Sequence, residues 1–317
     1  MNIVYLGSGQ FGIDCLNAIA ASPHKLSLVV TATPHPAGRG RLPTPTPVSI
    51  WAKENSIPLI ETDDVHSPKS ADRIKKAEPD LLVVIAFGHK IANTLTGLPP
   101  KGAVNVHASL LPKYRGAAPI NWAIINSEKE TGISIITLAE KIDAGDIIAQ
   151  SKTKIEPDEN SASLHDRLAL LAAPLLLETI NSIETGKAAY QKQDDSLATK
   201  APKLKKSDGF IDFGEPADTI RNKILGLFPW PGASANYLSK KTGKTEHVTF
   251  AAAEIIPSTN PEKISPGTID NNLNVICGQN ALKITQIKPA GSSIMSFRAF
   301  TNGRQTKPGD SFLKLQL

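Results

Sequence analysis

The stretch Leu81-Leu82-Val83-Val84-Ile85-Ala86 is apolar at every position. A strand of this composition is buried on both faces, which is typical of the centre of a parallel sheet. Outward from it, strand-like segments at 2–6, 26–30, 57–60, 132–138 and 146–155 alternate with helix-like segments at 11–21, 48–56, 69–77, 119–128 and 161–185. The alternation predicts an α/β domain with a Rossmann-type, mostly parallel sheet and flanking helices.

The first strand is followed by Gly7-Ser8-Gly9-Gln10-Phe11-Gly12, which has the spacing of a dinucleotide-binding turn. That turn normally has an acidic residue about 20 residues on, for a ribose hydroxyl. Here the second strand ends in Thr31-Ala32-Thr33, and after it no acid occurs before Glu54. Arg39 or Arg41 could serve a 2′-phosphate, so an NADP-dependent oxidoreductase remains an alternative. We interpret the glycines as a tight turn that opens the sheet.

Polar side chains follow the next apolar run, residues 102–104. Asn105 and His107 are separated by one residue, so on an extended backbone they point the same way, at the strand end where such sheets place ligands. Asp143 lies in a turn next to Ala144-Gly145. Together the three predict an acyl-transfer site, in which the amide and the imidazole hold an oxyanion and the carboxylate orients and charges the imidazole. Each pattern alone is also typical of a satisfied polar pair or a simple turn.

A longer motif continues from His107: Ser109-Leu110-Leu111-Pro112-Lys113-Tyr114-Arg115-Gly116-Ala117-Ala118-Pro119-Ile120. With Asn105-Val106-His107 and Asp143-Ala144-Gly145, it resembles the folate-dependent formyltransferases, most closely those that act on tRNA. The resemblance implies transfer of the formyl group of 10-formyltetrahydrofolate to the α-amine of methionine on initiator tRNA. It implies Asn105, His107 and Asp143 as catalytic residues. The residues it implies for folate binding are Phe87, Ile91, Ser109, Leu110, Leu111 and Pro112.

A proline-rich segment, residues 34–48, contains Ala37-Gly38-Arg39-Gly40-Arg41. Flexible glycines around arginines, framed by prolines, predict an exposed cationic loop. The resemblance implies that this loop, through Arg39 and Arg41, inserts at the end of the tRNA acceptor stem.

From residue 187 onward, the composition and the pattern of apolar residues change. Residues 187–206 are lysine-rich with little periodicity and are expected to be a linker between a catalytic domain, 1–186, and a second domain, 207–317. One helix, 218–225, and five short strands at 233–237, 247–256, 267–270, 273–277 and 281–289 predict a small β-barrel. Phe228-Pro229-Trp230-Pro231-Gly232-Ala233 resembles the family's OB-like, tRNA-binding domain, which implies phosphate contacts by Lys203, Lys205 and Lys206.

Charge is unevenly distributed. Residues 1–186 carry 17 Lys and Arg against 19 Asp and Glu, a net charge of −2, whereas residues 187–317 carry 18 against 11, a net charge of +7. A basic second part suits a polyanionic partner, although a lysine-rich solvated surface gives the same count.

Several classes of protein are disfavoured. The two cysteines, Cys15 and Cys277, lack metal-ligand spacing and are expected to be reduced thiols of a cytoplasmic protein. No apolar run approaches the roughly 18 to 20 residues that span a bilayer, and the first strand leaves no room for a signal peptide. No metal is expected, and the phosphate-binding loop of ATP-dependent enzymes is missing from the sequence. The expected partners are initiator methionyl-tRNA and tetrahydrofolate, without a membrane, and the expected state is a monomer.

Three rival functions remain at this point. A sugar-nucleotide N-formyltransferase would share the Asn, His and Asp site but would not need the loop at 37–48. An NADP-dependent oxidoreductase would use the glycines of residues 7–12. An RNA-binding module without catalysis would leave the spacing of Asn105 and Asp143 unexplained.

Overall fold

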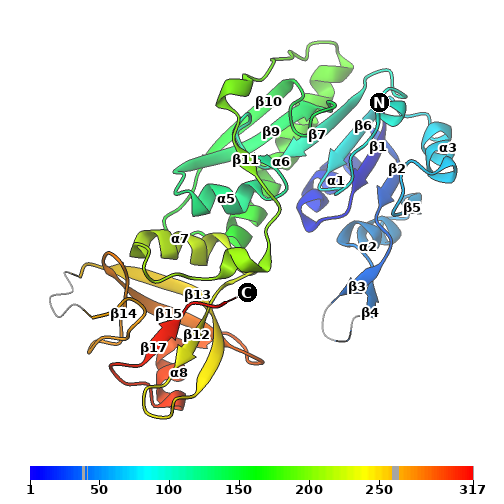
Figure 1. The fold of residues 1–317 in the computed structure, drawn as a ribbon. Coiled ribbons are helices and arrows are strands. Elements are labelled where there is room, and N and C mark those ends of the chain that lie inside the picture. Colours follow the sequence, from blue (N-terminus) through cyan, green and yellow to red (C-terminus); the bar gives the residue numbers. More distant parts are fainter. Residues whose placement is uncertain (38–39, 41, 259–263, 317) are drawn as a thin grey trace. The chain divides into compact units, whose positions relative to one another are not determined.

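The computed structural model describes residues 1–37, 40, 42–258 and 264–316 (Figure 1). The chain divides into two compact units. Unit 1 comprises Met1–Pro119, Glu130–Lys154 and His165–Pro202, and unit 2 comprises Ile120–Lys129, Ile155–Leu164 and Lys203–Leu317.

Unit 1 contains a large sheet, two small ribbons and flanking helices. Its strands are β1 (Asn2–Gly7), β2 (Lys25–Thr31), β3 (His35–Ala37), β4 (Leu42–Thr44), β5 (Leu59–Glu61), β6 (Leu81–Ile85), β7 (Ala103–His107), β8 (Arg115–Gly116), β9 (Glu130–Thr137), β10 (Ile147–Lys154) and β11 (Lys200–Ala201). Its helices are η1 (Gln10–Gly12), α1 (Ile13–Ala20), α2 (Pro47–Glu54), α3 (Pro68–Lys76), α4 (Asn93–Thr96) and η2 (Asp195–Leu197). Two further helices, α5 (Pro119–Ile125) and α6 (Ser161–Glu184), are divided between the units.

The seven-stranded sheet has the order β10-β9-β7-β6-β1-β2-β5. The five strands from β7 to β5 run parallel, and β9 and β10 are antiparallel to their neighbours. This confirms the predicted Rossmann-type, mostly parallel sheet. Strand order reverses between β1 and β6, and ligands of such sheets bind near the carboxyl ends of the strands at this reversal.

The central strand is buried as its composition predicts. All five residues of β6 are buried. One face contributes Leu82 and Val84 to a cluster that also contains Val4, Leu6 and Leu28. Because both faces of β6 are buried, none of its positions is exposed to solvent, and every position favours an apolar residue.

The proline-rich segment differs from the long loop that its composition predicts. Strands β3 and β4 form a small antiparallel ribbon, in which Pro36 lies opposite Pro43. Proline has no N–H group, so it fits the pair position at which a two-stranded ribbon makes no hydrogen bond. The ribbon projects away from the large sheet of unit 1 (Figure 1).

Unit 2 is built on an antiparallel sheet. Its elements are η3 (Lys206–Gly209), α7 (Ala217–Gly226), β12 (Ala233–Leu238), β13 (Thr245–Ile256), β14 (Val275–Ile276), β15 (Ala281–Pro289), β16 (Met295–Ser296), α8 (Phe297–Arg304) and β17 (Ser311–Leu313). The strand order is β14-β15-β13-β12-β17, with β16 paired to β15. Bridges from Thr268 to Ser311 and from Ile269 to Val275 join the two ends of this sheet. The result is a nearly closed barrel, which confirms the predicted small β-barrel.

The prediction of a single helix in this region is wrong. The helix α8 begins after Ser296, whose hydroxyl accepts a 3.2 Å hydrogen bond from the N–H of Ala299. Phe297 and Phe300, three residues apart, are both buried on one face of the helix. The helix is short and contains Gly303, so its periodicity alone was too weak to indicate it.

Candidate active site

The end of β7 brings two polar side chains to the same face of the sheet. His107 is buried, and its Nε2 lies 2.9 Å from the carbonyl oxygen of Tyr114. A carbonyl can only accept, so Nε2 carries the proton. The other ring nitrogen, Nδ1, faces Asp143 at 3.6 Å from its Oδ1 atom.

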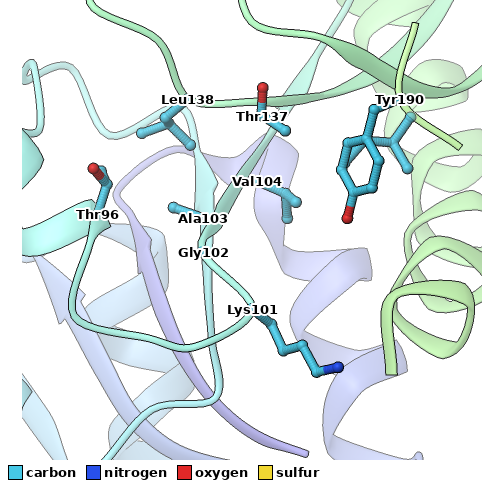
Figure 2. A pocket seen from close by; sticks show the side chains of 9 residues that line it. Thr96, Lys101, Gly102, Ala103, Val104, Thr137, Leu138 and Tyr190 are labelled. Carbon is cyan, nitrogen blue, oxygen red and sulfur yellow. The ribbon is translucent and has the colours of Figure 1, made fainter. Parts of the chain in front are cut away.

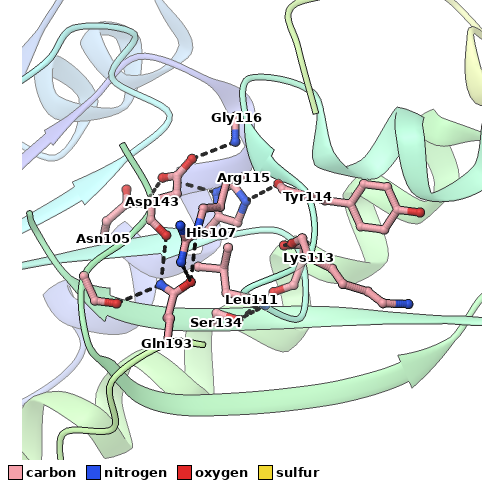
Figure 3. A network of polar contacts seen from close by, with 12 residues as sticks. Asn105, His107, Leu111, Lys113, Tyr114, Arg115, Gly116, Ser134, Asp143 and Gln193 are labelled. Carbon is pink, nitrogen blue, oxygen red and sulfur yellow. Dashed lines mark hydrogen bonds and ion pairs between the residues drawn. The ribbon is translucent and has the colours of Figure 1, made fainter. Parts of the chain in front are cut away.

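Asp143 completes the cluster from the loop between β9 and β10 (Figure 3). Its Oδ1 atom lies 3.5 Å from Nδ2 of Asn105, and its Oδ2 atom accepts a 2.8 Å hydrogen bond from the N–H of Gly116. The backbone of Asp143 has a φ of 56°, a left-handed conformation that is uncommon for residues other than glycine and often occurs at functional sites. The structure therefore brings Asn105, His107 and Asp143 together, with Oδ1 of the carboxylate between the amide and the imidazole.

Two polar residues that the sequence did not single out hold the loop after β7. The hydroxyl of Ser134, on β9, donates to the carbonyl of Ser109 at 2.6 Å and accepts from the N–H of Leu111 at 3.0 Å. Gln150, on β10, donates from Nε2 to the carbonyl of Leu111 at 2.9 Å. Ser134 interrupts the apolar run around Ile133 and Ile135, and a polar residue inside a buried strand is a signal that could have identified it.

The ribbon of β8 and β11 lies beside this cluster. Arg115, in β8, donates from Nη2 to Asp195 at 2.8 Å. The hydrogen bond and the charge of this guanidinium lower the pKa of the Asp195 carboxyl below its usual value. The N–H of Tyr114 donates to Oγ1 of Thr199 at 2.9 Å. The segment expected to be a linker is therefore paired with the candidate site over several residues.

The residues implied for folate binding are in two places. Phe87 and Ile91 are buried in the apolar cluster beside β6, against which Leu138 packs. Along the loop after β7, Ser109 and Leu111 are buried and Leu110 and Pro112 are half-buried.

A pocket of about 180 Å³ opens at the start of β7 (Figure 2). Its lining residues are Thr96, Lys101, Gly102, Ala103, Val104, Thr137, Leu138, Ile148 and Tyr190. Ala103 and Leu138 also border the cluster that contains Phe87 and Ile91. The pocket lies at the start of β7, at the opposite end of that strand from His107, and its lining does not include Phe87 or Ile91.

The glycine-rich turn is filled by a side chain of the protein itself. Tyr5 is fully buried, and a Cβ atom added at Gly12 would lie 1.8 Å from its hydroxyl oxygen. A Cβ at Gly7 would lie 2.6 Å from the same oxygen and 2.4 Å from the carbonyl oxygen of Ile85. Both glycines are therefore needed for internal packing, which accounts for the spacing without a dinucleotide.

The residues implied for tRNA contacts are only partly described. Arg39 and Arg41 lie outside the described residues. Lys203, Lys205 and Lys206 are exposed, and no ion pair of theirs is found among the residues that the structure describes.

Neither a cluster of metal ligands nor a membrane-spanning helix is found among the described residues. In that part of the chain, no group of three His, Cys, Asp or Glu side chains is arranged to hold a metal ion, and no helix is both long and apolar enough to cross a membrane. Cys15 and Cys277 are free and buried.

Comparison with known proteins gives matches along nearly the whole chain. A family model described as "Formyl transferase" matches residues 1–180, and one described as "Formyl transferase, C-terminal domain" matches residues 203–305. The chain is 38% identical to the methionyl-tRNA formyltransferase of Citrifermentans bemidjiense, over 98% of this chain and 95% of that protein. It is 40% identical to the methionyl-tRNA formyltransferase of Halalkalibacterium halodurans, over 96% of this chain and 95% of the relative.

Solved structures share the fold at lower identity. HypX from Aquifex aeolicus, in complex with tetrahydrofolic acid, superposes with a TM-score of 0.65 at 17% identity, over 100% of this chain and 51% of HypX. The sugar 3N-formyl transferase WlaRD superposes with a TM-score of 0.65 at 15% identity, over 92% of this chain and 99% of that chain. At these identities, the likeness shows the fold alone.

Proposed function

The chain belongs to the formyl transferase family, and we propose that it transfers the formyl group of 10-formyltetrahydrofolate to the α-amino group of methionyl initiator tRNA. The observation that carries the proposal is the convergence of Asn105 and His107 on Oδ1 of Asp143. Methionyl-tRNA as the molecule that receives the formyl group is inferred from relatives of nearly the same length that are named methionyl-tRNA formyltransferases.

In the proposed reaction, the neutral α-amine attacks the formyl carbon. The reference pKa of an α-amine is about 7.7–8.0, so a useful fraction is unprotonated near neutral pH. As the new C–N bond forms, the carbonyl electron pair moves to oxygen. Nδ2 of Asn105 donates a hydrogen bond to this oxygen. In its doubly protonated form, His107 donates from Nε2 to Tyr114 and from Nδ1 toward the same oxygen.

The proposed role of Asp143 is to orient the imidazole and to accept the proton that the amine loses, directly or through a water molecule. The tetrahedral centre then collapses, the bond from the formyl carbon to the folate nitrogen breaks, and that nitrogen takes up a proton. Because Gly116 holds Oδ2, Oδ1 is the atom assigned to these tasks.

For the folate, we propose that Phe87 and Ile91 form apolar walls around the pterin ring. Both side chains are buried in the apolar cluster beside β6 and follow the carboxyl end of that strand, where sheets of this kind bind their ligands, and this supports the placement. In the loop after β7, the buried side chains of Ser109 and Leu111 would shape the site, while half-buried Leu110 and Pro112 are accessible to a bound molecule.

For the tRNA, we propose contacts by Arg39 and Arg41 at the acceptor end and by Lys203, Lys205 and Lys206 along the phosphates. The proposed domains are a catalytic domain at 1–186, a connecting segment at 187–206 and a tRNA-binding domain at 207–317. We propose a cytoplasmic monomer that needs no metal and binds no membrane.

The test is an assay of the purified protein with 10-formyltetrahydrofolate and charged initiator tRNA. Formylmethionyl-tRNA should form, and amino-sugar nucleotides should not be formylated. Formylation of an amino sugar without formylation of Met-tRNA would replace the proposal with the sugar-nucleotide alternative. A fluorescence titration with NADPH should show no binding, because Tyr5 fills the glycine turn.

A further inference from the structure

The segment from residue 187 to residue 202 carries a glutamine whose amide is fully engaged beside the active site. Nε2 of Gln193 donates to the carbonyl oxygens of Asp143 and Gly145, at 2.8 and 2.7 Å. Its Oε1 accepts from Nε and Nη2 of Arg115, at 3.0 and 2.8 Å. A glutamine amide has two N–H donors and two lone pairs on oxygen, so these four bonds use its whole capacity.

These bonds act on the peptide that carries the catalytic carboxylate. Asp143 has the uncommon φ of 56°, and such a conformation persists where surrounding contacts hold it. Gln193 holds the carbonyls of Asp143 and Gly145, while the N–H of Gly116 holds the carboxylate. The carboxylate and its backbone are thus held by separate contacts.

The same segment also holds Gly116. Strand β11 pairs with β8 in parallel, with Ala201 opposite Gly116. The approach is so close that a Cβ atom at Gly116 would lie 2.4 Å from the carbonyl oxygen of Ala201. Residues 187–202 therefore support Asp143 through Gln193 and, by way of Gly116, through β11.

We propose that Gln193 is a positioning residue for formyl transfer, which sets the orientation of the Asp143 carboxylate without touching substrate. The proposal rests on the proposed function. It also gives residues 187–202, which lead directly to the part of the chain proposed to bind tRNA, a role in the chemistry. A displacement of about 1 Å in a catalytic group can cost on the order of 100-fold in rate, so the loss of Gln193 should be visible in kcat.

Two substitutions distinguish the hydrogen bonds donated by Nε2 of Gln193 from those accepted by its Oε1. Gln193→Glu keeps an acceptor for Arg115 but turns a carboxylate oxygen toward two carbonyl oxygens, which it cannot bond. Gln193→Ala removes both the donated and the accepted hydrogen bonds. The matched control is Gln191→Glu, which adds the same charge two residues earlier at an exposed side chain whose backbone alone pairs with Ile147.

The experiment measures kcat and KM for Met-tRNA and for 10-formyltetrahydrofolate, together with the melting temperature. Both Gln193 variants should lose about tenfold or more in kcat, with both KM values close to those of the parent protein. Gln191→Glu should keep the parent kcat and both KM values.

A parent-like kcat in both Gln193 variants would overturn the proposal, as would an equal loss in Gln191→Glu. So would a loss confined to KM, which would indicate a role in binding instead of positioning. Assays at low temperature, with circular dichroism to verify folding, separate a catalytic loss from unfolding. Failure of the proposed function is distinct from these outcomes, because the parent protein would then form no formylmethionyl-tRNA at all.

Discussion

The backbone N–H of Gly116 donates a 2.8 Å hydrogen bond to Oδ2 of Asp143, although 27 residues separate the two in the chain. This bond fixes which carboxylate oxygen is left for chemistry. Oδ1 faces Asn105 and His107 at 3.5 and 3.6 Å, distances longer than a strong hydrogen bond, so these groups can turn to a substrate oxygen.

Substitution of His107 or Asp143 should remove chemistry but not tRNA binding. We expect His107→Ala and Asp143→Ala each to lower kcat on the order of 100- to 1000-fold, because His107 donates to the oxyanion and Asp143 orients His107 for that role. Kinetics and filter binding of Met-tRNA measure the two effects separately. His247→Ala, at an exposed histidine of β13, is the control and should leave kcat unchanged. Near-normal turnover in both site variants would refute the assignment.

Gly116→Ala should reduce stability and activity together. Its φ is 132°, and an added Cβ atom would lie 2.4 Å from the carbonyl oxygen of Ala201, so the backbone leaves no room for a side chain. We expect a loss of about 1–3 kcal/mol in the free energy of unfolding, and a fall in kcat because the N–H moves away from Asp143.

Gly186→Ala is the control for backbone strain alone. Gly186 has a φ of 69° but nothing within 4 Å of its Cβ position. It should lose about 1–2 kcal/mol of stability, as a left-handed residue does, and keep the parent kcat. Urea denaturation and steady-state kinetics measure both quantities. An equal fall in kcat in the two variants would contradict the role of Gly116.

The stability lost by a substitution in the glycine turn should be recovered by a second substitution at Tyr5. Gly12→Ala places a methyl group 1.8 Å from the hydroxyl oxygen of Tyr5, whereas the next atom of that ring, Cζ, is 3.1 Å away. We expect Gly12→Ala to cost about 1–3 kcal/mol of stability through overpacking, and Tyr5→Phe to restore most of it by removing the hydroxyl.

Gly7→Ala provides the contrast. Its Cβ would also lie 2.4 Å from the backbone carbonyl of Ile85, so Tyr5→Phe should not rescue it. Tyr5→Phe alone should raise stability by about 1 kcal/mol, because the buried hydroxyl finds no hydrogen-bond partner among the described residues. Urea denaturation of the single and double variants measures these effects. Equal rescue of both glycine variants would contradict the packing account.

Neutralising the exposed lysines should weaken tRNA binding in a salt-dependent way. Lys203→Gln, Lys205→Gln and Lys206→Gln should each lower the slope of log affinity against log salt by about 0.7–0.9 if the lysine contacts a phosphate. The KM for folate should not change. Lys283→Gln is the control, because Lys283 already pairs with Glu254 at 3.0 Å. Equal slopes for all four variants and the parent would remove these lysines from tRNA recognition.

Alkaline pH should destabilise unit 2 through Tyr237. Burial and, to a smaller extent, the hydrogen bond to Asp310 raise the pKa of Tyr237 from 10.0 to about 12. A pKa raised by folding means that the neutral hydroxyl stabilises the folded state below pH 10, and that this contribution is lost as the pH rises toward 12. Unfolding by urea across this range should show a fall in stability that is smaller in Tyr237→Phe. An identical pH dependence in the two proteins would contradict the assignment.

Elements with strong local patterns were predictable from the sequence. The uninterrupted apolar residues of β6 predict a buried parallel strand, because a strand covered on both faces excludes polar side chains. Asn105 and His107 share a face because side chains alternate along a strand. The motif that joins them to Asp143 indicated the site, and the structure places the three side chains in contact.

Elements that depend on distant partners were not predictable. The ribbon of β3 and β4 has prolines at its centre, and α8 is too short for its periodicity to be distinctive. For Ser134, the sequence holds a weak signal, because the residue is polar in an apolar strand. For Gln193, the sequence holds no signal, because a glutamine in a polar, lysine-rich segment gives the same pattern whether its amide is solvated or hydrogen-bonded to the protein.

The sequence by itself determined which segments become strands and helices, which side chains share a face, and which chemical groups are available for formyl transfer. These properties follow from periodicity and residue type within a few neighbouring positions. Only the tertiary structure decided that Tyr5 fills the glycine turn, that Gly116 selects the free oxygen of Asp143, and that Gln193 holds the loop of that carboxylate. Each of these depends on the distance between atoms of residues far apart in the chain, and that distance is set only when the packed elements come together.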